Sequence, residues 1–143
     1  MIITKETDYA LRILRVLLDG EKHSVAEMSE TELIPTQFAY QILRKLSAGN
    51  LVQVSRGALG GCALSCDLDA TSLYDLMGVM GERGVLCACM EPGYECRWQD
   101  EHGRCAIHCQ LAALQRKQDE AFRAVSLRRL LTGGSDPQDT SEL

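Results

Sequence analysis

Five of the seven cysteines in this chain of 143 residues lie in one short segment, from Cys87 to Cys109. The segment also contains His108, three positions after Cys105. Thiolates and imidazoles bind zinc and iron–sulfur clusters, and clustered thiols also undergo reversible oxidation. An odd number of cysteines leaves one thiol over in a framework built only from disulfides. The residue types therefore predict metal binding or redox chemistry in this segment.

The rest of the composition is that of an ordinary globular protein, with 45% hydrophobic and 24% charged residues. The first residues, MIITKETDYALR, are charged and lack the apolar run of a signal peptide. No stretch reaches the about 18 consecutive apolar residues that a membrane-spanning helix needs. The sequence therefore predicts a cytoplasmic protein with no membrane partner, in a compartment where thiols stay reduced.

The formal net charge of −5 argues at first against a nucleic-acid partner. The charges are unevenly distributed, however, because all 20 acidic side chains lie outside residues 33–66. That window contains the basic residues Arg44, Lys45 and Arg56. Local charge governs where a phosphate backbone can approach, so the window is a candidate DNA-binding surface.

Short helices joined by tight turns are predicted before residue 50, and together they indicate a helix-turn-helix unit. Thr4 can cap the first, and SVAE at 24–27 is a capping box that opens the second. Pro35 suits the first position of the third helix. The predicted inner stripe of this third helix is Phe38, Ile42, Leu43 and Leu46.

A β-hairpin is predicted next, from the alternating residues 51–55, the glycine-rich turn RGALGG and the returning strand CALS. A hairpin in this place is a wing. A helix capped by Thr71 or Ser72 follows, with Leu73, Leu76, Met77 and Met80 at helical spacing. A long helix is expected from about Cys105 to Val125, and Ser126 caps a short last one.

The predicted fold class is therefore mainly α with a small β-hairpin wing: a winged helix-turn-helix plus a long C-terminal dimerisation helix. We expect a DNA-binding domain over residues 1–66 and dimerisation helices over 67–131, which include a cysteine-rich sensor loop at 86–109. The last residues, 132–143, have the composition of a disordered tail. The long helix packs either on its own domain or in a homodimer, which the symmetric DNA binding of winged helices favours.

These motifs resemble the IscR/NsrR-type winged-helix regulators of bacteria, the Rrf-two family. The resemblance covers residues 1–131 and rests on TKETDYALRIL, IPTQFAYQILRKLSAGNLV, RGALGG, the cysteine loop and VSLRRLL, in that order. It implies a dimeric transcription factor that binds double-stranded DNA and is not an enzyme. Several members carry an iron–sulfur cluster in the loop between their last two long helices.

The residues predicted to contact DNA lie on the exposed face of the third helix and in the glycine turn: Thr36, Gln37, Tyr40, Gln41, Arg44, Arg56, Gly57 and Gly60. Gln41 suits bidentate pairing with adenine, and Arg44 suits phosphate or guanine in the major groove. By the resemblance, the turn led by Arg56 enters the minor groove, where arginine senses groove width. The alternative is a solvated polar face.

By the same resemblance, Cys89, Cys96 and Cys105 hold the cluster, which is either [2Fe–2S] or [4Fe–4S]. Six residues separate the first pair and eight the second, and these gaps are longer than in related members. Counting from the preceding helix aligns Cys89, rather than Cys87, with the first ligand of the family.

Three residues are candidates for the fourth ligand. His108 matches the Cys-x-x-His pair of one branch, Asp8 of the partner subunit matches a nitric-oxide-sensing branch, and Cys109 follows Cys105 by four positions. Three thiolates with one oxygen or nitrogen ligand leave one iron weakly held and open to small molecules. The predicted signal is therefore redox state, nitric oxide or iron–sulfur status.

Other readings of the cysteines stay open. Zinc binds thiolates too, although the sequence has no paired Cys-x-x-Cys. A metal-free thiol switch of the same fold is another, and a metal-carrier or adaptor protein is a third that does not explain the acid-free window. No phosphate-binding loop or nucleophile elbow indicates an enzyme. Cys62 and Cys66, in the predicted wing, suit small buried hydrophobes.

Overall fold

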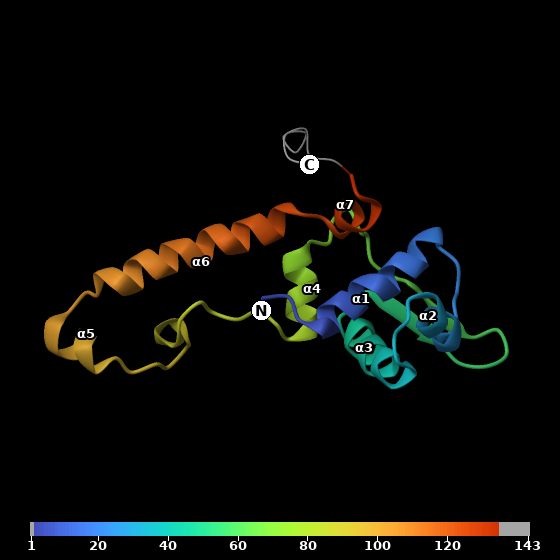
Figure 1. The fold of residues 1–143 in the computed structure, drawn as a ribbon, viewed down its shortest axis with the longest axis horizontal. Helices are drawn as coiled ribbons and strands as arrows, with labels where there is room; N and C mark the ends of the chain where they lie inside the picture. The colour runs from blue at the N-terminus through green and yellow to red at the C-terminus, as the bar shows by residue number, and fades with distance from the viewer. Residues whose placement is uncertain (1, 135–143) are drawn as a thin grey trace.

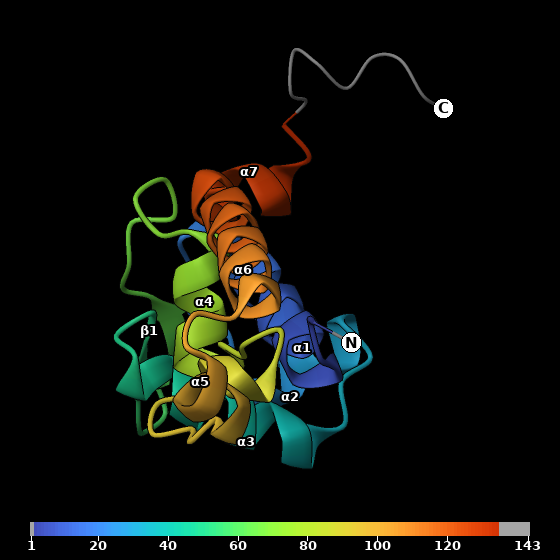
Figure 2. The ribbon, with the colours of Figure 1, turned by 90° about the vertical axis from the view of Figure 1, so that its left-hand side faces the viewer.

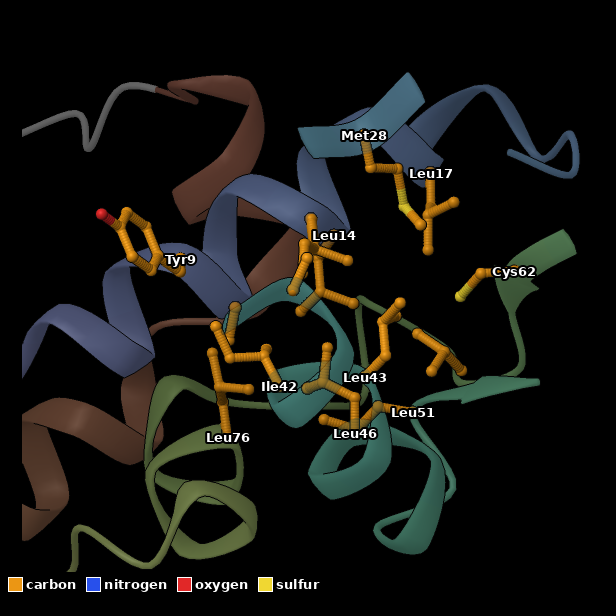
Figure 3. Close-up of a cluster of buried hydrophobic side chains, with 14 of the residues drawn as sticks. Tyr9, Leu14, Leu17, Met28, Ile42, Leu43, Leu46, Leu51, Cys62 and Leu76 are labelled. Carbon is orange, nitrogen blue, oxygen red and sulfur yellow. The ribbon is translucent and has the colours of Figure 1, made fainter. Parts of the chain in front are cut away.

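The apolar stripes predicted in the first half of the chain meet in one hydrophobic core (Figure 3). The computed structural model describes residues 2–134. The elements are α1 (Lys5–Val16), η1 (Leu17–Asp19), α2 (Val25–Thr31), α3 (Thr36–Ala48), β1 (Val52–Ser55), β2 (Gly61–Leu64), α4 (Leu73–Met80), η2 (Ala88–Met90), α5 (Arg97–His102), α6 (Ala106–Ala124) and α7 (Leu127–Thr132). The helices α1 to α4 and the hairpin lie at one end, and α6 extends away from them toward α5 (Figure 1).

Helix α1 supplies the central face of the core. It begins where the Thr4 hydroxyl accepts a hydrogen bond from the Glu6 N–H at 3.2 Å, as predicted. Ala10, Ile13 and Leu14 are completely buried, and the helix packs against α3 and α4. A change to 3₁₀ geometry in η1 and a left-handed glycine then end the helical run.

The helix-turn-helix prediction is confirmed by α2 and α3, with one error. Ile42, Leu43 and Leu46 are buried as expected. Phe38 was expected beside them, but its side chain is 45% exposed and its ring lies 6.3 Å from that of Tyr9. The inward position in the first turn of α3 belongs instead to the small residue Ala39, which lets α3 approach α1 closely.

The predicted wing is the antiparallel pair β1–β2, in which Ser55 lies opposite Gly61. Its turn requires glycine at two positions. Gly57 has φ +102°, and a Cβ on Gly60 would lie 2.5 Å from the Ser55 carbonyl oxygen. Cys62 of β2 points into the core and is only 1% exposed, as predicted for a small hydrophobe (Figure 3).

The four predicted inward residues of α4 are buried: Leu73, Leu76, Met77 and Met80. Ser72 caps this helix in a complete capping box with Asp75. Helix α7 returns to the start of α4, because the Leu127 N–H donates to the Thr71 carbonyl at 2.8 Å and the Leu127 side chain is completely buried. The C-terminal part of the chain is thereby anchored to the core.

Helix α6 matches the predicted long helix, yet none of its residues is buried. Ile107 and Leu114 are 71% and 55% exposed, so this chain alone does not cover the apolar stripe. Within residues 2–134, no helix is both long and apolar enough to cross a bilayer. The short helix α5 inside the cysteine loop was not predicted. Most of the predicted tail, 135–143, lies outside the described residues.

His23 joins the helix-turn-helix to the wing, a role that the sequence did not indicate. Its backbone pairs with that of Cys62 in β2 through two hydrogen bonds of 2.9 and 2.8 Å. Its imidazole lies between two carboxylates, with Nδ1 2.9 Å from Glu27 and Nε2 2.8 Å from Asp19. The hydrogen bonds to Glu27 and Asp19 raise the pKa of His23. They also explain why Glu27 does not complete the predicted capping box of α2.

A raised pKa makes the stabilisation by His23 depend on pH. The fold favours the charged imidazolium of His23. Its contribution to the unfolding free energy is therefore complete below the pKa of the unfolded chain, about 6.5, and is lost as the pH rises through the higher pKa of the folded protein. We expect His23→Gln to lower the unfolding free energy by up to about 1 kcal/mol at pH 6, because the carboxylate partners are half exposed. Urea unfolding at pH 6 and pH 9 measures this. If the difference in unfolding free energy between wild type and His23→Gln is larger at pH 9 than at pH 6, this prediction is wrong.

Candidate DNA-binding surface and cysteine loop

The residues of α3 predicted to contact DNA all face solvent. They are Thr36, Gln37, Tyr40, Gln41 and Arg44, and all five are exposed. Within residues 2–134, Arg44 forms no ion pair, whereas its neighbour Lys45 is held by Glu6 at 2.5 Å. The structure therefore presents one free cation and several amide and hydroxyl groups on the face of α3 opposite the core.

The turn of the wing is a second exposed surface. Arg56 and Gly57 are exposed, Gly60 is partly buried, and Arg56 has no ion-pair partner in the described part of the chain. The strand β1 follows α3 directly, because the Leu51 N–H donates to the Leu46 carbonyl at 2.9 Å. The hairpin is thereby joined directly to α3, and it lies at the opposite end of the molecule from α5 (Figure 1).

Four of the loop's chemical groups come together at the start of α6. The Cys89 thiol donates to the Cys87 sulfur at 3.5 Å, and the His108 Nδ1 lies 3.4 Å from the Cys89 sulfur. The Cys105 sulfur accepts the His108 N–H at 3.5 Å and so caps α6. Figure 2 looks along the molecule from the side of this loop. The sequence preferred Cys89 over Cys87, but the structure places both thiols together.

Electrostatics distinguish these thiols. The neighbouring Cys87 raises the pKa of Cys89, and desolvation, Cys105 and Cys96 add to this effect. The Cys89 backbone N–H and thiol lower the pKa of Cys87, because both stabilise its thiolate. Along the chain, α5 separates Cys96 from Cys105.

The described chain does not assemble a complete metal site by itself. No three His, Cys, Asp or Glu side chains among residues 2–134 converge closely enough to hold an ion. Asp8 lies on α1 and pairs with Arg12 at 3.0 Å rather than with the loop. Cys109 accepts a hydrogen bond from Arg104 at 3.1 Å. The five loop cysteines and His108 nevertheless supply sulfur and nitrogen donors of the kind that iron–sulfur clusters and zinc prefer.

The two cysteines outside the loop differ from those within it. Burial raises the pKa of the Cys62 thiol to about 11, so this sulfur stays protonated and inert. Burial also raises the pKa of Cys66, which is partly exposed after β2. By contrast, the pKa of Cys87 in the loop is lowered by its hydrogen bonds from Cys89.

The whole described fold corresponds to one protein family. The Rrf2 family, described as iron-dependent transcriptional regulators, matches residues 3–133. This chain belongs to the Rrf2 family. Members of the Rrf2 family are transcriptional regulators that act on DNA rather than enzymes, so the predicted family, fold class and absence of an enzymatic role are confirmed.

Individual proteins are similar to this chain over most of its length. Protein aau3 of Rhizobium meliloti strain 1021 is 31% identical over 125 residues, which cover 85% of this chain and 77% of that protein. CymR, the global cysteine regulator of B. subtilis, has 20% identity and a TM-score of 0.65, covering 93% of this chain and 98% of its own. IscR of T. potens has 15% identity and a TM-score of 0.66, covering 98% and 93%. At these identities, the two structures show a shared fold alone.

Proposed function

We propose that this Rrf2 protein is a homodimeric, sequence-specific DNA-binding regulator whose cysteine loop senses redox state, nitric oxide or iron–sulfur status. The observation that carries the proposal is the grouping of Cys87, Cys89, Cys105 and His108 at the end of α6 that is remote from the exposed face of α3. A regulator needs a DNA-contacting surface and a separate place where a signal acts. The two ends of this molecule supply these two surfaces.

For the DNA surface, we assign base contacts to α3 and backbone contacts to the wing. Gln41 has the amide that pairs bidentately with adenine, and Arg44 has the fork for guanine or phosphate. Thr36, Gln37 and Tyr40 lie on the same exposed face of α3 as Gln41 and Arg44. Arg56 stands at the start of a turn that Gly57 and Gly60 keep free of side chains, so its guanidinium can enter a narrow groove.

Two substitutions separate these roles. Arg56→Ala should weaken binding to specific and random duplexes alike, and one lost phosphate contact should reduce the salt slope by roughly 0.9. Gln41→Ala should cost about 1–3 kcal/mol on the operator and leave random-sequence binding nearly unchanged. Fluorescence anisotropy across a salt series measures both. Equal losses on both DNAs for Gln41→Ala would remove this residue from the base readers.

For assembly, we propose that α6 pairs with α6 of a second copy. The helix carries exposed apolar side chains over several turns and has no buried residue within its own chain. Large exposed apolar patches on regulators mark interaction sites. A two-fold dimer would set two recognition helices about one DNA turn, ~34 Å, apart.

A charged substitution in the middle of the proposed α6–α6 interface tests the dimer. Leu114 is 55% exposed, so Leu114→Asp should leave the monomer fold intact and yet bury a charge in the dimer. We expect a dimer for wild type and a monomer for the variant in sedimentation velocity at micromolar concentration. Arg116→Asp, which changes the opposite side of α6, is the matched control and should stay dimeric. A monomeric wild type would overturn the assembly.

For the sensor, we propose Cys89, Cys96 and Cys105 as the ligands of an iron–sulfur cluster, with His108 or Asp8 of the partner subunit as the remaining ligand. Within one chain, the distances favour His108, which already touches the Cys89 sulfur and follows Cys105 on α6. Asp8 faces solvent with Arg12 and would need the second subunit. Bound there, the cluster would supply an iron centre that reacts with oxygen or nitric oxide.

A metal-free thiol switch is the second candidate, and one contact favours it. The sulfur atoms of Cys87 and Cys89 lie 3.5 Å apart, and the lowered pKa of Cys87 favours its nucleophilic thiolate form. The structural relative CymR is described as a global cysteine regulator, which agrees with sensing by thiols. Zinc remains a third occupant of the same sulfur donors.

Cys96→Ala distinguishes these sensors, because the Cys96 side chain caps no helix and its loss removes only a proposed ligand. Anaerobic reconstitution with iron and sulfide should give wild type and Cys66→Ala a visible absorbance that Cys96→Ala lacks. His108→Ala and Asp8→Ala should differ, with the true ligand's loss making the cluster labile. Iron and zinc analysis accompanies the spectra. A wild type that takes up zinc but no iron would replace the cluster with the zinc alternative.

A further inference from the structure

The segment between α4 and the cysteine loop, residues 81–86, is bonded to the first helix on one side and to the long helix on the other. We propose that Glu82 in this segment is a positioning residue that couples the state of the cysteine loop to α1 and, through α1, to the recognition helix α3. The inference rests on the proposed function, in which the loop is the sensor and α3 contacts DNA. It assigns the connection between them to one carboxylate.

Glu82 binds the first turn of α1 with both carboxylate oxygens. The hydroxyls of Thr4 and Thr7 donate to the carboxylate, and the Thr4 N–H lies 3.4 Å from it. Thr7 is completely buried, so its hydroxyl has no water to replace this partner. A carboxylate is also favoured at a helix N-terminus by the exposed N–H groups and the helix dipole. Glu82 therefore holds the N-terminal turn of α1, which Thr4 caps locally.

The other end of the segment is held by α6. The Gln115 side chain accepts the Leu86 N–H at 2.7 Å and donates to the Gly84 carbonyl at 3.4 Å. Its amide is itself fixed by Asp119 at 2.9 Å. Leu86 immediately precedes Cys87, so a rearrangement of the cysteines acts directly on these bonds. A motion of the loop relative to α6 must break them or carry Glu82 with it.

The segment has room and backbone freedom for such a motion. A cavity of about 280 Å³ lies beside it, lined by Met77, Val85 and Phe122 among others. Gly81 sits in the left-handed region at φ +79°, where other residues are strained, and Gly84 has no atom near the place of a Cβ. A short glycine-flanked segment beside a cavity can shift between arrangements without disturbing the closed core.

From α1, the connection continues to α3 through Lys45. Its ammonium pairs with Glu6 at 2.5 Å, in the same first turn that Glu82 holds, and donates to the Met80 carbonyl at 3.4 Å. Lys45 follows Arg44 and lies one helical turn after Gln41. A displacement of the start of α1 or the end of α4 therefore acts on the helix that carries the proposed base contacts. Allosteric coupling between the cysteine loop and α3 needs an element whose arrangement both of them influence, and α1 is that element here.

A double-mutant cycle tests the assignment. Wild type, Glu82→Ala, Cys96→Ala and the double variant are reconstituted anaerobically with iron and sulfide, and their operator affinities are measured. Cys96→Ala should shift the wild-type affinity by an allosteric factor, typically about 5- to 150-fold. In the Glu82→Ala background, the same change should shift affinity less than about 2-fold, a small share of that coupling. Glu82→Ala alone should keep its iron and its absorbance, and its operator affinity is the reference for the double variant.

A second readout follows α1 directly and does not depend on DNA. Hydrogen exchange in the first turn of α1 should change on cluster loading in wild type and stay constant in Glu82→Ala. Thr7→Val keeps the buried volume but removes one donor to Glu82, so it should reduce the coupling in the same direction if Glu82→Ala folds poorly. Glu30→Ala removes an exposed carboxylate that forms no ion pair within the described chain, and it should behave as wild type.

The outcomes separate the two proposals. Suppose that the Glu82→Ala single variant holds its cluster and that adding Cys96→Ala shifts its operator affinity as much as in wild type. This result overturns the role of Glu82 and leaves the proposed function standing. A wild type that takes up no iron overturns the cluster instead. The exchange comparison then uses alkylation of the loop thiols by N-ethylmaleimide as the perturbation. If alkylation changes hydrogen exchange in the first turn of α1 equally in wild type and in Glu82→Ala, the coupling through Glu82 is also overturned.

Discussion

Burial of one face of α1 against α3 and α4 is the interaction on which the rest of this structure depends. Ala10, Ile13 and Leu14 lose all contact with water, and each large side chain contributes about 1.5–3 kcal/mol on full burial. The same helix presents Thr4 and Thr7 to Glu82, Glu6 to Lys45, and Asp8 to solvent. Because the core fixes the rotation of α1, it also fixes where each of these polar groups points.

The molecule then divides into a closed part and an open part. The helix-turn-helix, the wing, α4 and α7 share one core, whereas α6 and the cysteine loop contribute no buried residue to it apart from their anchor at α7. The closed part can therefore keep its shape while the open part changes its ligands or its thiol state. This arrangement suits the regulator that we propose, because its DNA-contacting surface would keep its shape while the loop responds to a signal.

The cysteines follow the same division. Cys62 lies in the core, where burial keeps it protonated, and the five loop thiols lie where solvent and small molecules reach them. The Cys89 sulfur contacts both the Cys87 sulfur and the His108 imidazole, because Cys105 caps α6 and His108 lies in the first turn of that helix. The metal or redox chemistry that we propose for the loop would therefore act outside the core, and the contacts around Glu82 connect the loop to the first helix.

The sequence by itself determined the elements whose causes are local. Thr4, Ser24, Ser72 and Ser126 cap the helices that were predicted to start there, and the glycines of the wing allow only a tight turn. The sequence did not reveal that His23 bridges two carboxylates or that Cys87 joins Cys89, although these partners lie only four and two positions apart. Only the tertiary structure decided that Ala39 rather than Phe38 faces the core. It also decided the contact of Glu82 with Thr7, which are 75 positions apart. Caps and turns depend on a few neighbouring residues, whereas these contacts exist only after packing has set the helices' rotation and distance.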